Sequence, residues 1–160
     1  METNSILQLI EILKSQYSHY TEVRDTLLEE KQAVTSWNNK VLLDLNSRKE
    51  QLAKKERLLE EARNTLANRI QQEYQLENNT VTSIIEVAED KEKTELIEIK
   101  SKLLSLTTEI KDVTMSLKAI YTTNLKIIND IKAKLGFVPA NKYGMEKSTV
   151  SLPQALQITG

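Results

Sequence analysis

The first 135 residues of this 160-residue chain contain neither glycine nor proline. All three glycines and both prolines lie at Gly136 or beyond it. Because glycine and proline are the strongest breakers of regular structure, the turns within the first 135 residues must be made by other residue types. The change at Gly136 predicts that the helical part of the chain ends there, with Gly136 directly after the last helix and with Lys132 and Lys134 complementing the helix dipole.

Apolar residues recur at seven-residue spacing in three successive segments, which predicts helices that pair with one another. Aromatic residues make up only 4% of the sequence, so the core is expected to be thin and built from leucine, isoleucine and valine. The three series are Ile6, Leu13, Tyr20, Leu27, Val34 and Val41; Leu45, Leu52, Leu59 and Leu66, continuing to Ile70 and Tyr74; and Leu96, Leu103, Ile110, Leu117 and Leu125.

We therefore predict an all-α fold: an elongated antiparallel coiled-coil bundle of three long helices, a short connecting helix and a flexible C-terminal tail. The helical body should occupy residues 1–135 and the tail residues 136–160. Within the body we expect helices at about residues 4–35, 37–78, 83–88 and 90–135. The tail holds the glycines and prolines and lacks sustained periodicity, yet it is too apolar to be a simple polar spacer.

The first turn is placed at residues 35–40, where Ser36 is the expected N-cap and two asparagines tolerate left-handed backbone. One unbroken helix is the alternative, because the seven-residue series crosses this segment without slipping. The second turn is placed at residues 77–83. There Asn78 or Asn79 can end a helix, and Ser83 with Glu86 matches a capping box for the next one.

Composition argues against several classes of partner. The chain has no cysteine, which excludes disulfides, thiol catalysis and zinc–thiolate sites. Its net charge of −1 and the lack of a clustered basic face offer nothing to nucleic acid, so no nucleic-acid partner is expected. The sequence does not begin with a basic segment, and no uncharged apolar run approaches the length of a membrane span. We expect no membrane insertion and a cytoplasmic location.

Residues with catalytic potential do not form a recognisable set. His19 is the only histidine, and we expect it to be a surface or interface residue and not a ligand or a base. Neighbouring carboxylates such as Glu60 and Glu61 would point in different directions on a helix. No glycine-rich phosphate loop, nucleophile elbow or metal-spaced set of ligands is present. We expect no enzymatic activity, no metal and no cofactor, and a function in binding through helix surfaces.

The order of these segments resembles the FlgN family of flagellar export chaperones. Residues 29–70 are similar to the first helical hairpin of that family, with a "RKEQL" element followed by "LEEAR". Residues 80–110 resemble its short connecting helix, its acidic stretch and the start of its last long helix. That helix passes through "TTNLKIINDI" to a tail with a Tyr-Gly pair. The resemblance covers about residues 6–145.

The resemblance implies a cytoplasmic chaperone of the flagellar type III export system. Such proteins bind the C-terminal helical segments of the hook-filament junction proteins FlgK and FlgL, prevent their premature assembly and deliver them to the export gate component FlhA. The resemblance therefore implies that the binding groove lies on the third long helix. The later half of this helix has apolar residues over a wider face than pairing with one neighbouring helix requires. The expected substrate-binding residues are Leu117, Ile120, Tyr121, Leu125, Ile128, Ile131 and Leu135.

Tyr143 matches the tail tyrosine that the family associates with docking to the export gate. Alternatives remain at each of these positions. The apolar set on the last helix also fits an ordinary core or a dimer interface, so the sequence leaves a homo-oligomer open. Phe137 and Tyr143 also fit a hydrophobic staple that folds back onto the helices. Two other functions compete: a structural coiled-coil scaffold or export stalk similar to FliJ, and an accessory or regulatory subunit of an enzyme.

Overall fold

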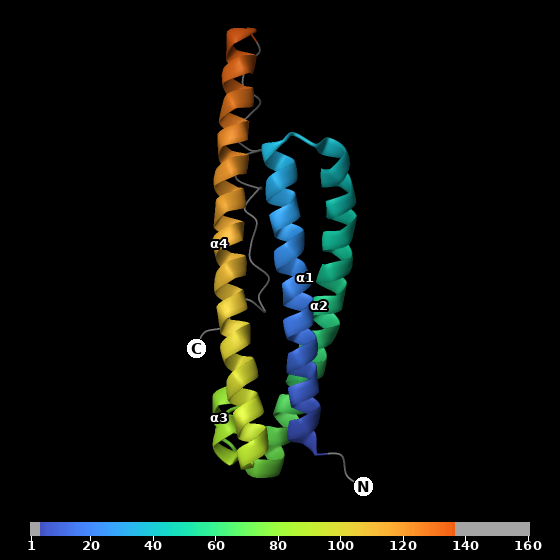
Figure 1. Cartoon of the computed structure of the whole chain (residues 1–160), viewed down its shortest axis with the longest axis vertical. Coiled ribbons are helices and arrows are strands. Elements are labelled where there is room, and N and C mark those ends of the chain that lie inside the picture. Colours follow the sequence, from blue (N-terminus) through green and yellow to red (C-terminus); the bar gives the residue numbers. More distant parts are fainter. Residues whose placement is uncertain (1–3, 137–160) are drawn as a thin grey trace.

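A computed structural model describes residues 4–136 of the chain, which form four helices (Figure 1). Helix α1 spans Ser5–Thr35, α2 spans Asn39–Tyr74, α3 spans Val81–Val87 and α4 spans Asp90–Lys134. The described residues therefore consist of three long helices and one short connecting helix, which confirms the predicted all-α bundle. The tail predicted at residues 136–160 lies outside the described residues except for Gly136.

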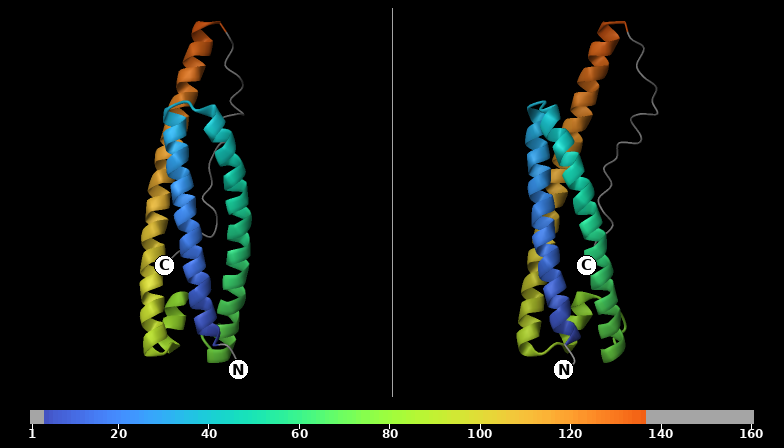
Figure 2. Two further views of the ribbon diagram at one scale, coloured as in Figure 1. Left: turned by 45° about the vertical axis from the view of Figure 1, so that its right-hand side comes forward. Right: turned by 90° about the vertical axis from the view of Figure 1, so that its right-hand side faces the viewer.

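Helix α1 lies between the other two long helices and packs along both of them. The chain runs up in α1, down in α2 and up again in α4, so α2 is antiparallel to the other two (Figures 1 and 2). Helix α3 lies at the lower end, where it contacts both α2 and α4. The two outer helices, α2 and α4, do not share a packed seam comparable to those they form with α1.

The core consists of two apolar clusters that follow each other along the bundle. The seven-residue series of the first helix is confirmed from Ile6 to Val34, all of whose members are buried. Its last member, Val41, is exposed because it lies in α2, beyond the turn. The lower cluster includes Ile6, Leu9, Ile10, Leu13, Ile70, Ile84, Leu96 and Ile99; the upper one includes Tyr20, Leu27, Val34, Leu106, Ile110 and Leu117.

The turn between α1 and α2 occupies residues 36–38, so the alternative of one unbroken helix is excluded. The predicted cap at Ser36 is wrong, because Ser36 ends α1: its backbone N–H and its hydroxyl both donate to the carbonyl of Gln32. The left-handed residue is Trp37, at φ 55°, and not an asparagine. Asn38 is the N-cap of α2, and its side-chain oxygen accepts from the backbone N–H of Val41.

The second turn also differs from the prediction. Helix α2 ends at Tyr74, before the two asparagines, and Gln75 is the left-handed residue that closes it. The expected capping box at Ser83 is wrong, because Thr80 is the N-cap of α3 and its hydroxyl accepts from the backbone N–H of Ser83. Asn78 takes part through its side-chain oxygen, which accepts from both the Thr80 backbone and the Ser83 hydroxyl. The cap therefore lies three residues earlier than expected.

The end of α4 follows the prediction. Gly136 has φ 81° and comes directly after the C-cap residue Leu135. Its backbone N–H donates to the carbonyl of Ala133. Glycine adopts this left-handed conformation without steric cost, which explains its place after the helix. Lys132 and Lys134 lie in the last turn, as the sequence indicated.

Polar groups lie in the interior where the lower and upper clusters meet, and we call them the polar layer. They are the buried side chains of Gln16 and His19 and the hydroxyl of Tyr20, whose ring belongs to the upper cluster and which lies near Glu56 of α2. His19 is completely buried, which agrees with the interface position expected from the sequence and excludes the surface position. Burial, followed by the charge of Lys55 on α2, lowers the pKa of His19.

Candidate functional site

Helix α4 extends well beyond the turn that joins α1 and α2 (Figure 1). The two parallel helices begin at the same end of the bundle, where the side-chain amide of Asn4 donates to the carboxylate of Glu92. Helix α4 has 45 residues and α1 has 31, so the last part of α4 has no neighbouring helix among the described residues. At 1.5 Å per residue, this part is about 20 Å long. We call residues 122–135, which are the last part of α4 and its C-cap residue Leu135, the exposed end of α4.

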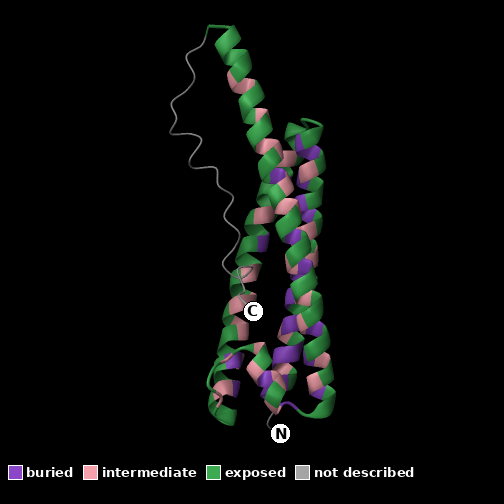
Figure 3. Ribbon diagram, turned by 90° about the vertical axis from the view of Figure 1, so that its left-hand side faces the viewer, coloured by how far each residue is buried: buried purple, intermediate pink, exposed green. Residues whose placement is uncertain are grey.

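The structure divides the predicted substrate-binding residues into two groups. Leu117 is buried in the upper cluster, and Ile120 and Tyr121 are half-buried against it. These three side chains pack on α1. The other four lie on the exposed end of α4, with no buried residue among them (Figure 3): Leu125, Ile128, Ile131 and Leu135.

The exposed end of α4 presents a broad apolar surface. Ile131 and Leu135 are 52% and 69% exposed, and Leu125 is also exposed. Ile128, Ile131 and Leu135 are spaced by three and four residues and therefore lie along one side of the helix. This side continues the face on which Leu117 packs against α1, and Leu125 lies at its edge. Side chains of this size are normally covered in a folded protein, so a contiguous set of them marks an interaction surface.

Ile127 belongs to the same surface and was missed by the sequence reasoning. It is 45% exposed and lies next to Ile128, so the two side chains point to different sides of the helix. The sequence indicates this width through two adjacent isoleucines, Ile127 and Ile128, because neighbouring side chains on a helix cannot both face one partner. Ile127 widens the apolar surface beyond a single seam.

A buried carboxylate fixes the base of the exposed end. Glu30 of α1 is only 4% exposed, and both of its oxygens accept from the ammonium group of Lys49 of α2, at 3.0 and 3.2 Å. The hydroxyl of Tyr121 of α4 donates to Glu30 Oε1 at 2.7 Å. We call these three residues the Glu30 cluster. Its hydrogen bonds connect α1, α2 and α4 at the point beyond which α4 has no neighbouring helix among the described residues.

The electrostatics of the Glu30 cluster favour the hydrogen-bonded form of the tyrosine. Burial, followed by the hydrogen bond to Glu30, raises the pKa of Tyr121 above its ordinary value. The tyrosine is therefore neutral at physiological pH and remains a donor to the carboxylate. A hydrogen bond to an ionised acceptor is stronger than one between neutral groups, so Tyr121 is held in place as a positioning residue at the start of the exposed end.

Within residues 4–136, no group of three or more histidine, aspartate or glutamate side chains is arranged to hold a metal ion. No helix in this part of the chain is long and apolar enough to cross a membrane. Tyr143, the residue expected to dock to the export gate, lies outside the described residues. The site that the structure does describe is a helix surface suited to binding another polypeptide.

The family comparison agrees with this arrangement. Residues 1–150 match the model of a protein family described as FlgN protein. No curated protein and no solved structure matches the chain. The match covers nearly the whole sequence, including all four helices. The chain therefore belongs to the FlgN family.

Proposed function

We propose that this protein is a flagellar export chaperone that binds the C-terminal helical segments of the junction proteins FlgK and FlgL. The exposed end of α4 is the binding surface, and the complex prevents premature assembly of the substrates before they reach the export gate component FlhA. The observation that carries this proposal is the uncovered apolar surface of α4, in a chain of the FlgN family. That family consists of chaperones and not of enzymes.

The physics of helix pairing supports such a role. An apolar stripe with no partner helix is suited to an amphipathic helix that lays its own apolar face against it. A substrate segment that orders only on binding loses conformational entropy, and this cost lowers the affinity. The complex can then be tight enough to protect the segment and weak enough to release it at the gate. Lys126, Lys132 and Lys134 flank the apolar residues and favour a segment with acidic side chains beside its apolar face.

The two groups of predicted residues have different roles in this proposal. Leu125, Ile128, Ile131 and Leu135, together with Ile127, contact the substrate directly. Leu117, Ile120 and Tyr121 pack on α1 and hold the base of the surface in place.

Co-purification with FlgK and FlgL from the same bacterium tests the binding surface. We expect the double variant Ile131→Glu, Leu135→Glu to bind at least about tenfold more weakly, because buried apolar anchors dominate helix-in-groove affinity. The matched control is Ile97→Glu, Met115→Glu. Ile97 and Met115 are 52% and 60% exposed on the part of α4 that packs on α1, so the same chemical change is made outside the surface.

Binding of wild-type protein to neither junction protein would refute the proposed function. Equal loss in the variant and in its control would refute the placement of the surface. A chain that ends at Gly136 should retain substrate binding, because the proposed surface ends there.

The role of Tyr143 is proposed separately, from the family resemblance. An aromatic ring with a hydroxyl group is a suitable anchor for a docking contact. Tyr143→Ala should weaken binding to FlhA and leave binding to FlgK and FlgL unchanged. Loss of both interactions to the same extent would show that Tyr143 has a packing role instead.

A further inference from the structure

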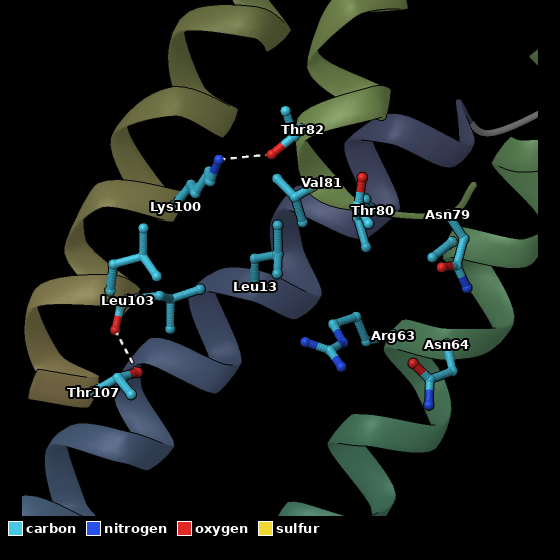
Figure 4. A pocket seen from close by; sticks show the side chains of 13 residues that line it. Leu13, Arg63, Asn64, Asn79, Thr80, Val81, Thr82, Lys100, Leu103 and Thr107 are labelled. Atoms are coloured by element: carbon cyan, nitrogen blue, oxygen red, sulfur yellow. Dashed lines mark hydrogen bonds between the residues drawn. The ribbon is translucent and has the colours of Figure 1, made fainter. Parts of the chain in front are cut away.

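A second apolar surface lies at the other end of the molecule, in a hollow between α2 and α4. Helix α1 forms its floor through Leu9 and Leu13, and α3 closes one end of it. Figure 4 shows α4 on one side, α2 on the other and α1 behind, with the side chain of Leu13 between them. The volume is about 200 Å³. We call this hollow the α2–α4 groove.

The floor of the groove is apolar. Leu9 and Leu13 belong to the lower cluster, as does Ala67 on the α2 side, and Leu103 packs against that cluster from α4. Leu104, also on α4, is 43% exposed at the edge. A dry cavity of about 150 Å³ can hold a molecule the size of benzene. The groove therefore has room for one or two side chains of leucine size.

The charges at the rim have one sign. Arg63 extends from α2 towards the opening, and Lys100 lies across from it on α4 (Figure 4). No carboxylate lines the groove. The ammonium group of Lys100 donates to the hydroxyl of Thr82 at 2.7 Å, and neither cation forms an ion pair with any described residue. Two cations above an apolar floor complement a ligand that is apolar and acidic.

We propose that the α2–α4 groove binds a short acidic segment of a partner protein, which inserts a leucine-sized side chain between Leu13 and Leu104 and places carboxylates beside Arg63 and Lys100. The volume of the groove allows the partner to insert one or two apolar side chains, and the two cations at the rim favour negative charges beside them in the partner. This proposal is independent of the proposed chaperone function, because the groove and the exposed end of α4 lie at opposite ends of the molecule.

The chain's own C-terminal segment fits the rim less well. Residues 137–160 contain two lysines and one glutamate, so the net charge of their side chains has the same sign as the rim. This comparison favours a separate acidic partner over the tail, and the experiment distinguishes the two.

NMR titration of the full-length, ¹⁵N-labelled protein tests the proposal. The probe is a ten-residue acetylated and amidated peptide with two leucines flanked by glutamates, and the comparison peptide has lysines in place of the glutamates. We expect the acidic peptide to shift the backbone amides around Leu13, Thr82, Lys100 and Leu104, and the basic peptide to bind at least about tenfold more weakly.

Charge reversal in Arg63→Glu, Lys100→Glu should reduce the affinity for the acidic peptide by about tenfold or more. The control is Lys40→Glu, Lys54→Glu, which changes the net charge equally at exposed positions outside the groove and should leave the affinity within about twofold. Circular dichroism checks whether each variant remains folded. If either charge-reversal variant unfolds, Leu104→Glu, at an exposed edge position, replaces it and should reduce the affinity as strongly.

Three results would overturn the proposal. The first is equal binding of both peptides, or no shift at the groove with the acidic one. The second is a change in the groove amides when residues 137–160 are deleted, which would identify the tail as the occupant. The third is a dependence of these shifts on protein concentration, which would identify a second copy of the chain.

Discussion

His19 is a fully buried imidazole whose two ring nitrogens have no hydrogen-bond partner among the described residues. Three other polar atoms of the polar layer are also buried without a hydrogen-bond partner among the described residues: Gln16 Nε2, the Tyr20 hydroxyl oxygen and one Glu56 oxygen. Each such group costs about 1–3 kcal/mol relative to a satisfied one. Polar residues at positions of this kind disfavour other pairings of the helices, because a shift in register would bring them against the apolar clusters. The polar layer thus favours one register at the expense of stability.

The burial of His19 predicts how stability depends on pH. Burial, followed by the nearby Lys55, lowers the pKa of His19 below its ordinary 6.5, and Glu22 opposes the shift. The unfolded chain takes up a proton near pH 6.5 while the folded chain does not, so the folded state loses stability as the pH falls below that value. We expect the free energy of unfolding to decrease by up to about 1.4 kcal/mol per pH unit in this range.

Urea unfolding between about pH 7.5 and pH 5.5 measures this effect, with His19→Leu as the control. His19 is the only histidine, so the variant should lose the added slope and be more stable than the wild type at the lower pH. Burial raises the pKa of Glu56, and this group acts in the opposite sense in both proteins. Identical slopes in wild type and variant would contradict the account of His19.

The attachment of α4 to the other two long helices depends on a few contacts near its exposed end. The last fully buried side chain of α4 is Leu117, and one turn further on Tyr121 donates to Glu30. Exposed ion pairs such as Arg24 with Glu109 also join α1 and α4, but such pairs contribute little to stability. The Glu30 cluster is therefore the main polar contact that holds the base of the exposed end.

Tyr121→Phe removes one hydrogen bond and keeps the aromatic ring. Because the acceptor is a buried carboxylate, we expect the free energy of unfolding to fall by about 1.5–3 kcal/mol in chemical denaturation. The matched control is Tyr74→Phe, since Tyr74 is exposed and its hydroxyl has no hydrogen bond to a described residue. That change should stay within about 0.5 kcal/mol. A loss as large in the control as in Tyr121→Phe would contradict the role of the cluster.

The elements were more predictable than their ends. The apolar series from Ile6 to Val34 identified the buried face of α1, because helix pairing depends mainly on spacing. The residues that end and cap the helices at the two inner turns were not predicted, because serine, threonine and asparagine all fit these positions and tertiary packing selects among them. Trp37 at positive φ is a case that residue preferences alone would not identify.

The buried polar residues of α1 also follow a seven-residue spacing, which a search for apolar residues alone does not detect. Leu9, Gln16, Val23 and Glu30 form a second seven-residue series on α1, in which two members are polar. Both polar members are buried, one in the polar layer and one in the Glu30 cluster. For the candidate site, the predicted lengths of the first and last helices carry the missing information. Because the last helix is longer than the first, Leu125 and the residues after it have no part of α1 to pack on.

At the scale of the whole molecule, the bundle is open on two sides. Helix α1 is covered by both neighbours, while α2 and α4 meet mainly through α1 and α3, which leaves the α2–α4 groove at one end. At the other end α4 extends alone (Figure 3). An isolated helix of about this length is only marginally stable in water, so the exposed end should open locally far more often than the rest of α4. A bound substrate helix would suppress these openings.

Amide hydrogen exchange of residues 122–135, with and without a junction protein, tests the central claim most directly. We predict fast exchange in the free chaperone and at least about tenfold slower exchange in complex with FlgK or FlgL, while the amides of α1 change little. Slow exchange in the free protein would contradict the account, because it would mean that this surface is already covered before any substrate binds, as in a structural scaffold that pairs with itself. A complex that forms without slowing exchange in residues 122–135 would also contradict it.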